Sequence, residues 1–121
     1  MIHHCSGHMR RFMEVCLLEL LFEADSHGYA LAEQLADLGF SEDELHIGTL
    51  YRTLRGMEQS GFLRSFWKSG GAGPRRRVYS ITQEGLEALD EWMNILQKRQ
   101  ARIKKLLSRH TQAKNKIKEL H

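Results

Sequence analysis

The sequence predicts a mainly α-helical fold with one small β-hairpin, and three observations lead to this expectation. Three short helical patterns follow one another between residues 10 and 60, a strand-like segment with a glycine-rich turn comes next, and the C-terminal third repeats apolar residues at heptad spacing. Closely spaced helices suggest a helix-turn-helix, and a hairpin directly after them would form its wing. We therefore expect a winged helix-turn-helix DNA-binding domain over residues 9–82 and a C-terminal dimerisation helix over residues 83–121.

The first predicted helix runs from Arg10 to Ala24 and is apolar on more than one side. A helix that is apolar nearly all round must be covered on two sides. Its own domain can supply one cover, and a partner subunit is a candidate for the other, with Leu17 and Leu21 at that interface. The apolar residues of this helix are Phe12, Met13, Val15, Leu17, Leu18, Leu20, Leu21 and Phe22.

The second predicted helix is short and amphipathic. Residues 25–28 supply capping and turn chemistry, and Leu31, Leu35 and Leu38 then recur at positions i, i+4 and i+7. This spacing predicts one buried stripe and a helix that ends near Gly39.

The third predicted helix extends from about Ile47 to Ser60 and stops at Gly61. One stripe is apolar, formed by Ile47, Leu50, Leu54 and Met57, whereas the opposite face carries Gly48, Arg52, Arg55 and Gln59, flanked by Thr49 and Tyr51. Arginine can bind guanine in a bidentate manner, and tyrosine can donate to phosphate, so this face suits the DNA major groove. The alternative is a solvated face in which the arginines pair with Glu58 or Gln59.

A β-hairpin is predicted from residues 62–69 and 75–81, with a glycine-rich tip between them. Lys68, Arg75, Arg76 and Arg77 lie on these two strands and suit contact with phosphates. Because side chains alternate along a strand, Arg75 and Arg77 share one face and Arg76 lies on the other. We therefore expect at least one of the three arginines to brace the hairpin instead of contacting DNA.

Thr82 is expected to cap a long C-terminal helix. A coiled-coil seam follows in steps of three and four residues, and its expected interface members are Leu89, Met93, Leu96, Gln100, Ile103 and Leu107. Gln100 is polar at a seam position, where such a residue tends to fix the register of a dimer. The alternative is a helix that folds back on its own domain.

The charges are segregated along the chain, although 18 basic and 15 acidic residues leave a net charge of only +3. Nine acidic and no Lys or Arg residues lie between Glu14 and Glu44, whereas nine basic residues and one acidic residue follow Gln97. The predicted third helix and hairpin are also basic. Local basic regions attract polyanions even when the whole chain is nearly neutral.

Composition narrows the setting in which the protein works. The chain has no apolar stretch of the length that a bilayer requires and no signal-peptide pattern, so we expect a cytoplasmic protein with no membrane partner. Two cysteines are too few for a disulfide framework. No catalytic constellation or phosphate-binding loop stands in a recognisable context, so neither an enzyme nor a cofactor is expected.

Three sequence blocks resemble the PadR family of transcriptional regulators. They are residues 27–31 (HGYAL), residues 48–54 (GTLYRTL) with the following Glu58 and residues 61–63 (GFL), and residues 74–82 (PRRRVYSIT) with Gly85. The blocks occur in the order and spacing of that family, and the resemblance covers residues 12–107. His46 departs from it, because the family often has serine just before the third helix.

The resemblance implies a homodimer that represses transcription at a palindromic operator in double-stranded DNA. The chain length corresponds to the short branch of the family, with a single long C-terminal helix. DNA contacts carry over to Thr49, Tyr51, Arg52, Arg76 and Arg77, whereas Tyr29 and Tyr79 are expected to support the fold. A small aromatic effector is a further candidate partner, with Trp92 beside the seam as its contact.

Two other functions remain open from the sequence. His4, Cys5 and His8 carry nitrogen and sulfur ligands that suit Zn²⁺ or Cu⁺, which would make the protein a metal-sensing repressor. A protein interaction adaptor would instead use the coiled coil and the acidic surface.

Overall fold

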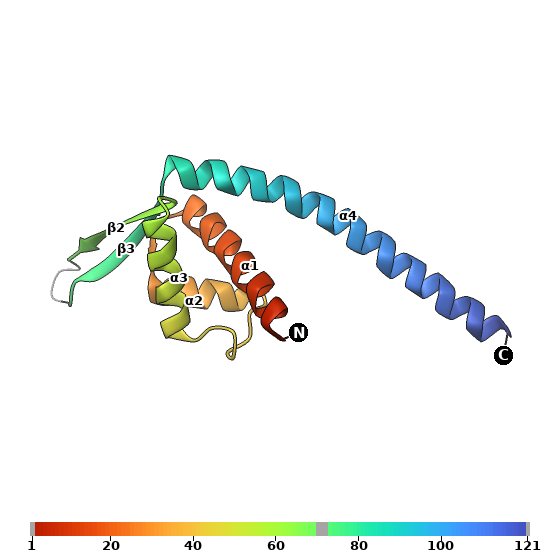
Figure 1. Cartoon of the computed structure of the whole chain (residues 1–121). Coiled ribbons are helices and arrows are strands. Elements are labelled where there is room, and N and C mark those ends of the chain that lie inside the picture. The colour runs from red at the N-terminus through yellow and green to blue at the C-terminus, as the bar shows by residue number, and fades with distance from the viewer. Residues whose placement is uncertain (1, 70–72, 121) are drawn as a thin grey trace. The chain divides into compact units, whose positions relative to one another are not determined.

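The computed structural model describes residues 2–69 and 73–120, with side chains from residue 11 onward. These residues form helices α1 (Ile2–Glu23), α2 (Gly28–Asp37), α3 (Ile47–Gln59) and α4 (Gln83–Leu120), and strands β1 (Ser26–His27), β2 (Leu63–Lys68) and β3 (Arg76–Ile81) (Figure 1). The mainly helical fold with a small hairpin is therefore as predicted. The chain divides into two compact units, Met1–Leu89 and Asp90–His121. Within the described residues, no helix combines the length and apolar content needed to cross a membrane.

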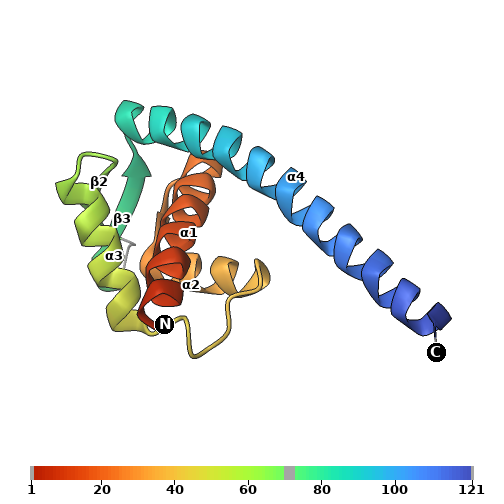
Figure 2. The ribbon, with the colours of Figure 1, turned by 45° about the vertical axis from the view of Figure 1, so that its right-hand side comes forward.

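The core of the first unit is built from α1, α2, α3 and one face of the sheet. Figures 1 and 2 show α1, α2 and α3 gathered beside the strands. Full burial of one large apolar side chain contributes about 1.5–3 kcal/mol, so this cluster is the main source of stability. Its most deeply buried side chains are Leu17, Leu21, Leu31, Leu35, Leu50, Leu54 and Tyr79.

Helix α1 differs from the expectation in two ways. It begins at Ile2 instead of near Arg10. Leu17 and Leu21, expected to face a partner, are 0% and 2% exposed, because the chain's own core covers them. Phe12 and Phe22 are exposed instead, and the ring of Phe12 stacks on Phe40 at 5.9 Å. The surface that α1 can offer to a partner therefore lies outside the two leucines.

Glycines end α2 and α3 at the predicted places. Gly39 and Gly61 have φ angles of +102° and +88°, in the left-handed region that glycine adopts at little steric cost. At the first, the N–H of Phe40 donates to the Leu35 carbonyl at 3.2 Å, and at the second, the N–H of Phe62 donates to the Met57 carbonyl at 3.0 Å. These bonds satisfy carbonyls at the ends of the helices and turn the chain sharply.

Two residues expected on buried stripes are exposed. Leu38 is 53% exposed because α2 ends at Asp37, so helical periodicity no longer directs its side chain. Ile47 is 42% exposed at the first position of α3. The polar Thr53 is buried in its place among the α3 leucines, and its hydroxyl donates to the Thr49 carbonyl at 2.8 Å.

The sheet has three antiparallel strands in the order β1-β3-β2, one more than the predicted hairpin. The additional strand pairs Ser26 with Tyr79 and His27 with Val78. A strand of two residues has no measurable alternation, so the sequence showed only a turn at this place. Strands β2 and β3 form the predicted hairpin, and the expected glycine-rich tip at residues 70–72 lies outside the described residues.

Thr82 caps α4 as predicted and also joins three segments. Its hydroxyl oxygen accepts a hydrogen bond from the Gly85 N–H at 3.1 Å, and its hydroxyl donates to the Gly61 carbonyl at 2.6 Å. The Thr82 N–H donates to the Phe62 carbonyl at 3.1 Å. The end of β3, the turn after α3 and the start of α4 are therefore held together.

Candidate nucleic-acid interface

Helix α3 presents the exposed polar face that the sequence predicts. Leu50, Leu54 and Met57 are buried on one side, at 1%, 0% and 3% exposure. On the other side Gly48, Arg52, Arg55 and Gln59 are exposed, whereas Thr49 and Tyr51 are half-buried. His46 precedes the helix and makes no capping hydrogen bond with its side chain.

The two arginines on this face lie in different local settings. The Arg52 Nε donates to the Gly48 carbonyl at 3.3 Å, one turn back along α3. Arg52 also lines a small cleft between α1 and α3 that includes Glu14, whereas Arg55 lines the cleft between α3 and the wing. Glu58, the alternative partner for these arginines, forms its ion pair with Arg77 of β3 instead. Solvent-exposed guanidinium groups on α3 are the geometry that major-groove contact requires.

Tyr51 lies against the start of α2. A Cβ atom added to Gly28 would be 2.6 Å from the Tyr51 hydroxyl oxygen and 2.7 Å from its Cζ, so only glycine leaves room for this ring. Tyr29 is 68% exposed beside this contact, although the sequence suggested a supporting role in the fold. Both tyrosines line a cleft of roughly 740 Å³ between α2, α3 and the wing, together with Arg55, Trp67 and Arg75.

One face of the wing is tied to α3 by a closed set of polar contacts. Arg77 Nη2 lies 3.2 Å from Glu58 Oε1, Ser65 Oγ donates to Glu58 Oε2 at 2.8 Å, and Arg77 Nε donates to Ser65 Oγ at 2.9 Å. The Arg77 guanidinium lies 5.9 Å from the Trp67 ring and 5.8 Å from the Tyr79 ring. Burial is the largest influence on Tyr79 and raises the pKa of its phenol, while nearby Arg77 opposes the rise.

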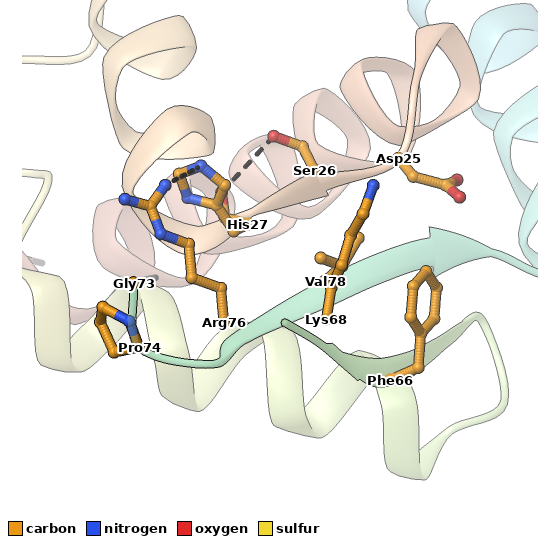
Figure 3. A pocket seen from close by; sticks show the side chains of 9 residues that line it. All are labelled: Asp25, Ser26, His27, Phe66, Lys68, Gly73, Pro74, Arg76 and Val78. Atoms are coloured by element: carbon orange, nitrogen blue, oxygen red, sulfur yellow. Dashed lines mark hydrogen bonds between the residues drawn. The ribbon is translucent and has the colours of Figure 1, made fainter. Parts of the chain in front are cut away.

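The opposite face of the wing holds Lys68 and Arg76 at facing positions of β2 and β3. Two like charges that face each other across strands repel, so this pair favours an anion nearby. Arg76 Nη1 lies 3.2 Å from Nε2 of His27, and Figure 3 shows these two side chains pointing toward each other. Together with Phe66 and Val78 they line a cleft of roughly 650 Å³.

The predicted dimer residues on α4 fall on both sides of the unit boundary. Leu89 is 3% exposed and belongs to the core of the first unit. In the second unit Met93 and Leu96 are partly buried and Gln100 is exposed, whereas Ile103 and Leu107 are 56% and 61% exposed. Ile103 and Leu107 lie on the predicted seam, whereas Ile95 and Leu106 are exposed apolar residues of α4 outside it.

The remaining predicted sites are Trp92 and the N-terminal histidine and cysteine cluster. Trp92 is partly buried, and the Arg99 guanidinium lies 5.7 Å from its ring, so a cation already contacts one face of the indole. The side chains of His4, Cys5 and His8 lie outside the described part of the chain. From residue 11 onward, where side chains are described, no group of three His, Cys, Asp or Glu residues could hold a metal ion.

Sequence reasoning missed three residues at the interface. His27 lies in the segment predicted to supply capping and turn chemistry and does cap α2, but its contact with Arg76 was not foreseen. Glu58 was considered only as an alternative partner for Arg52 and Arg55, six and three positions before it in sequence, because a helical pattern shows only local partners. Tyr29 was set aside as structural. Its position in the first turn of α2, two residues after a cap, was the available signal, since helix N-termini suit phosphate oxygens.

The sequence matches the model of the family described as "Transcriptional regulator PadR-like family" over residues 17–91. A PadR family transcriptional regulator from Eggerthella lenta is similar in structure, with a TM-score of 0.67 and 34% sequence identity. The alignment covers 88% of this chain and 91% of that one. A PadR-like regulator from Bacillus cereus gives a TM-score of 0.70 at 29% identity, with 78% of this chain and 89% of that chain covered.

A third similar structure is that of Bacillus subtilis PadR in complex with operator DNA. The identity is 20% and the TM-score 0.60, over 69% of this chain and 47% of that one. At 20% identity this comparison supports the fold of the chain and nothing finer.

Proposed function

The chain belongs to the PadR-like family of transcriptional regulators, so it is a DNA-binding regulator and not an enzyme. We propose that it acts as a homodimer and represses transcription at a palindromic operator. In this proposal α3 enters the major groove. Arg52 and Arg55 contact base edges, and Tyr51 and Thr49 fix the helix on the backbone. The observation that carries the proposal is the exposed polar face of α3, next to a wing with basic residues on both of its faces.

The wing supplies the phosphate contacts in this proposal. Lys68 and Arg76 face each other across β2 and β3, and Arg75 is exposed on the opposite face. Such contacts carry no sequence information, but they fix the orientation of the recognition helix. The similar Bacillus subtilis PadR was solved in complex with operator DNA, which supports double-stranded DNA as the partner in this proposal.

The dimer is proposed from the seam on α4. Ile103 and Leu107 are exposed apolar residues at heptad positions, and a second copy of the helix would remove them from water. A symmetric dimer presents two recognition helices, whose half-sites would lie about 34 Å apart, one turn of DNA. A small aromatic effector that changes this separation would release the operator, with Trp92 as the candidate contact.

The first experiment is the selection of duplexes by the wild-type chain from a random-sequence library, followed by titration of the best 30-bp duplex. Arg52→Ala should weaken binding to this duplex by about 1–3 kcal/mol and relax the preference at one base position, because a bidentate base contact is lost. Arg102→Ala, an exposed arginine on α4, is the matched control and should leave the sequence preference intact.

A preference that is unchanged in Arg52→Ala would contradict the assignment of α3 as the recognition helix. Failure of the wild-type chain to select any duplex at low salt would contradict DNA reading altogether and favour the adaptor function.

A further inference from the structure

Glu58, Ser65 and Arg77 form a closed triangle of contacts between three elements. Glu58 comes from the last turn of α3, Ser65 from β2 and Arg77 from β3. Each side chain contacts the other two, at 2.8–3.2 Å between the bonded atoms. The carboxylate uses both oxygens, one toward each strand. A contact of this kind fixes direction as well as distance, because moving the wing in either sense breaks one side of the triangle.

Arg77 is the basic residue of the wing whose side chain is most engaged within the protein. Its Nε and Nη2 donate to Ser65 and Glu58, and its guanidinium lies near the rings of Trp67 and Tyr79. Binding a phosphate with these donors would break charge-assisted hydrogen bonds that already exist. Arg76 on β3 and Arg75 just before it are more exposed than Arg77. Phosphate can therefore reach them without breaking the hydrogen bonds that hold Arg77.

The triangle stands next to two of the α3 residues proposed to contact DNA, Tyr51 and Arg55. Tyr51, Arg55 and Glu58 recur at positions i, i+4 and i+7 of α3, so they lie along one side of the helix. Tyr51 and Arg55 line the same cleft as Arg77 and Tyr79 of β3. A change in the angle between the wing and α3 therefore changes the width of the cleft that these side chains share.

We propose that Glu58, Ser65 and Arg77 act as a clamp that sets the angle between the recognition helix and the wing. Arg77 is then a positioning residue and not a phosphate contact. This inference rests on the proposed DNA-binding function and assigns to Glu58, an acidic residue beside a DNA surface, the role of strengthening binding. Direct electrostatics alone would give it the opposite role, since a carboxylate repels phosphate.

The experiment titrates the selected 30-bp duplex and sequence-mixed calf thymus DNA with wild type, Glu58→Gln, Arg77→Gln and the double variant at 50–200 mM salt. If the clamp operates, each single variant should lose about tenfold in affinity for the selected duplex. The double variant should lose no more than either single variant, because all three break the same unit. The slope of log affinity against log salt should stay that of the wild type in every variant.

The clamp is excluded if Arg77→Gln flattens the salt slope by about 1, the effect of losing one phosphate contact, while Glu58→Gln binds as well as or better than wild type. Ser65→Ala removes two of the three contacts but leaves the ion pair between Glu58 and Arg77, so it should also weaken binding to the selected duplex, by less than tenfold, with the salt slope of the wild type. Circular dichroism at the titration temperature identifies a variant that fails to fold, and the charge-swapped pair Glu58→Arg with Arg77→Glu then tests whether the contact itself restores binding. Failure of the wild-type chain to select a duplex would instead contradict the proposed function.

Discussion

At the scale of single residues, the DNA-facing surface depends on close packing behind it. Tyr51 is half-buried, and its ring occupies the space where any other residue at position 28 would place a Cβ atom. Gly28 is itself buried at the start of α2. A side chain proposed to contact DNA is thus positioned by a buried residue of a neighbouring helix.

Gly28→Ala should displace the Tyr51 ring and weaken binding to the selected duplex. The added Cβ would meet Tyr51 atoms at 2.6–2.7 Å, and the end of this side chain can move away from the contact more easily than the backbone can. Stability should therefore change by less than about 1 kcal/mol, since alanine also favours the helix by a similar amount. Titration of the selected duplex with each variant measures the affinity, and urea denaturation of the same variants measures the free energy of unfolding.

The matched control is Gly56→Ala on α3, where an added Cβ meets nothing within 4 Å. It should be more stable than wild type by about 0.5–1 kcal/mol with unchanged Tyr51 packing. If Gly28→Ala weakens binding equally in a Tyr51→Ala background, displacement of the ring is not the cause.

Among the elements of the first unit, the start of α4 is the place where the turn after α3 and the end of β3 meet. Thr82 bonds to the Gly61 carbonyl and to the Gly85 N–H, and the buried Gly85 lies against the Phe62 carbonyl. The glycine is required here by close approach and not by its φ angle. The turn after α3, the end of the sheet and the last helix therefore pack as one joint.

Gly85→Ala should destabilise the folded chain by about 1–3 kcal/mol, because overpacking against backbone cannot be relieved by a side-chain rotation. The added Cβ would clash with the Phe62 carbonyl and approach Ile81 Cγ1 to 2.7 Å. Urea denaturation at constant protein concentration measures the change. Gly56→Ala is again the control, and a Gly85→Ala chain as stable as wild type would show that the junction can relax.

At the scale of the whole molecule, charge is divided between elements that the proposed dimer would bring together. Burial, followed by contact with neighbouring Glu23, raises the pKa of Glu19 on α1. Two carboxylates that repel each other are stabilised by a cationic partner. The sequence after Gln97 supplies nine basic residues and one acidic residue, all on α4. We expect this part of one protomer to lie near α1 of the other.

Replacing both Glu19 and Glu23 by Lys should weaken the dimer at low salt, and added salt should then strengthen the variant dimer instead of weakening it, since attraction across the interface becomes repulsion that salt screens. Sedimentation equilibrium at 50 and 500 mM salt gives the dimer dissociation constant. The double variant Asp37→Lys with Glu42→Lys makes the same change of charge at exposed positions outside α1. An unchanged constant in the α1 variant would rule out this electrostatic pairing.

Local pattern predicted most of the elements and the exposed face of α3. The period of Leu50, Leu54 and Met57 identified the buried side, and the residues opposite are exposed as expected. The glycines at 39 and 61 marked the ends of two helices because their positive φ is a local property of the backbone. Periodicity was misleading at Leu38 and Ile47, which stand at helix ends where the pattern no longer fixes direction.

The fold class, the C-terminal ends of α2 and α3 and the residue types on the outer face of α3 could be predicted from the sequence, because these follow from interactions within a few positions of the chain. The three-dimensional packing was needed to show that Leu17 and Leu21 belong to the core, that Ser26 and His27 add a strand, and that Glu58 pairs with Arg77. The two pairings join residues far apart in sequence, 19 positions for Glu58 with Arg77 and 53 for Ser26 with Tyr79. No local period records such contacts, since they arise when the core brings distant elements together.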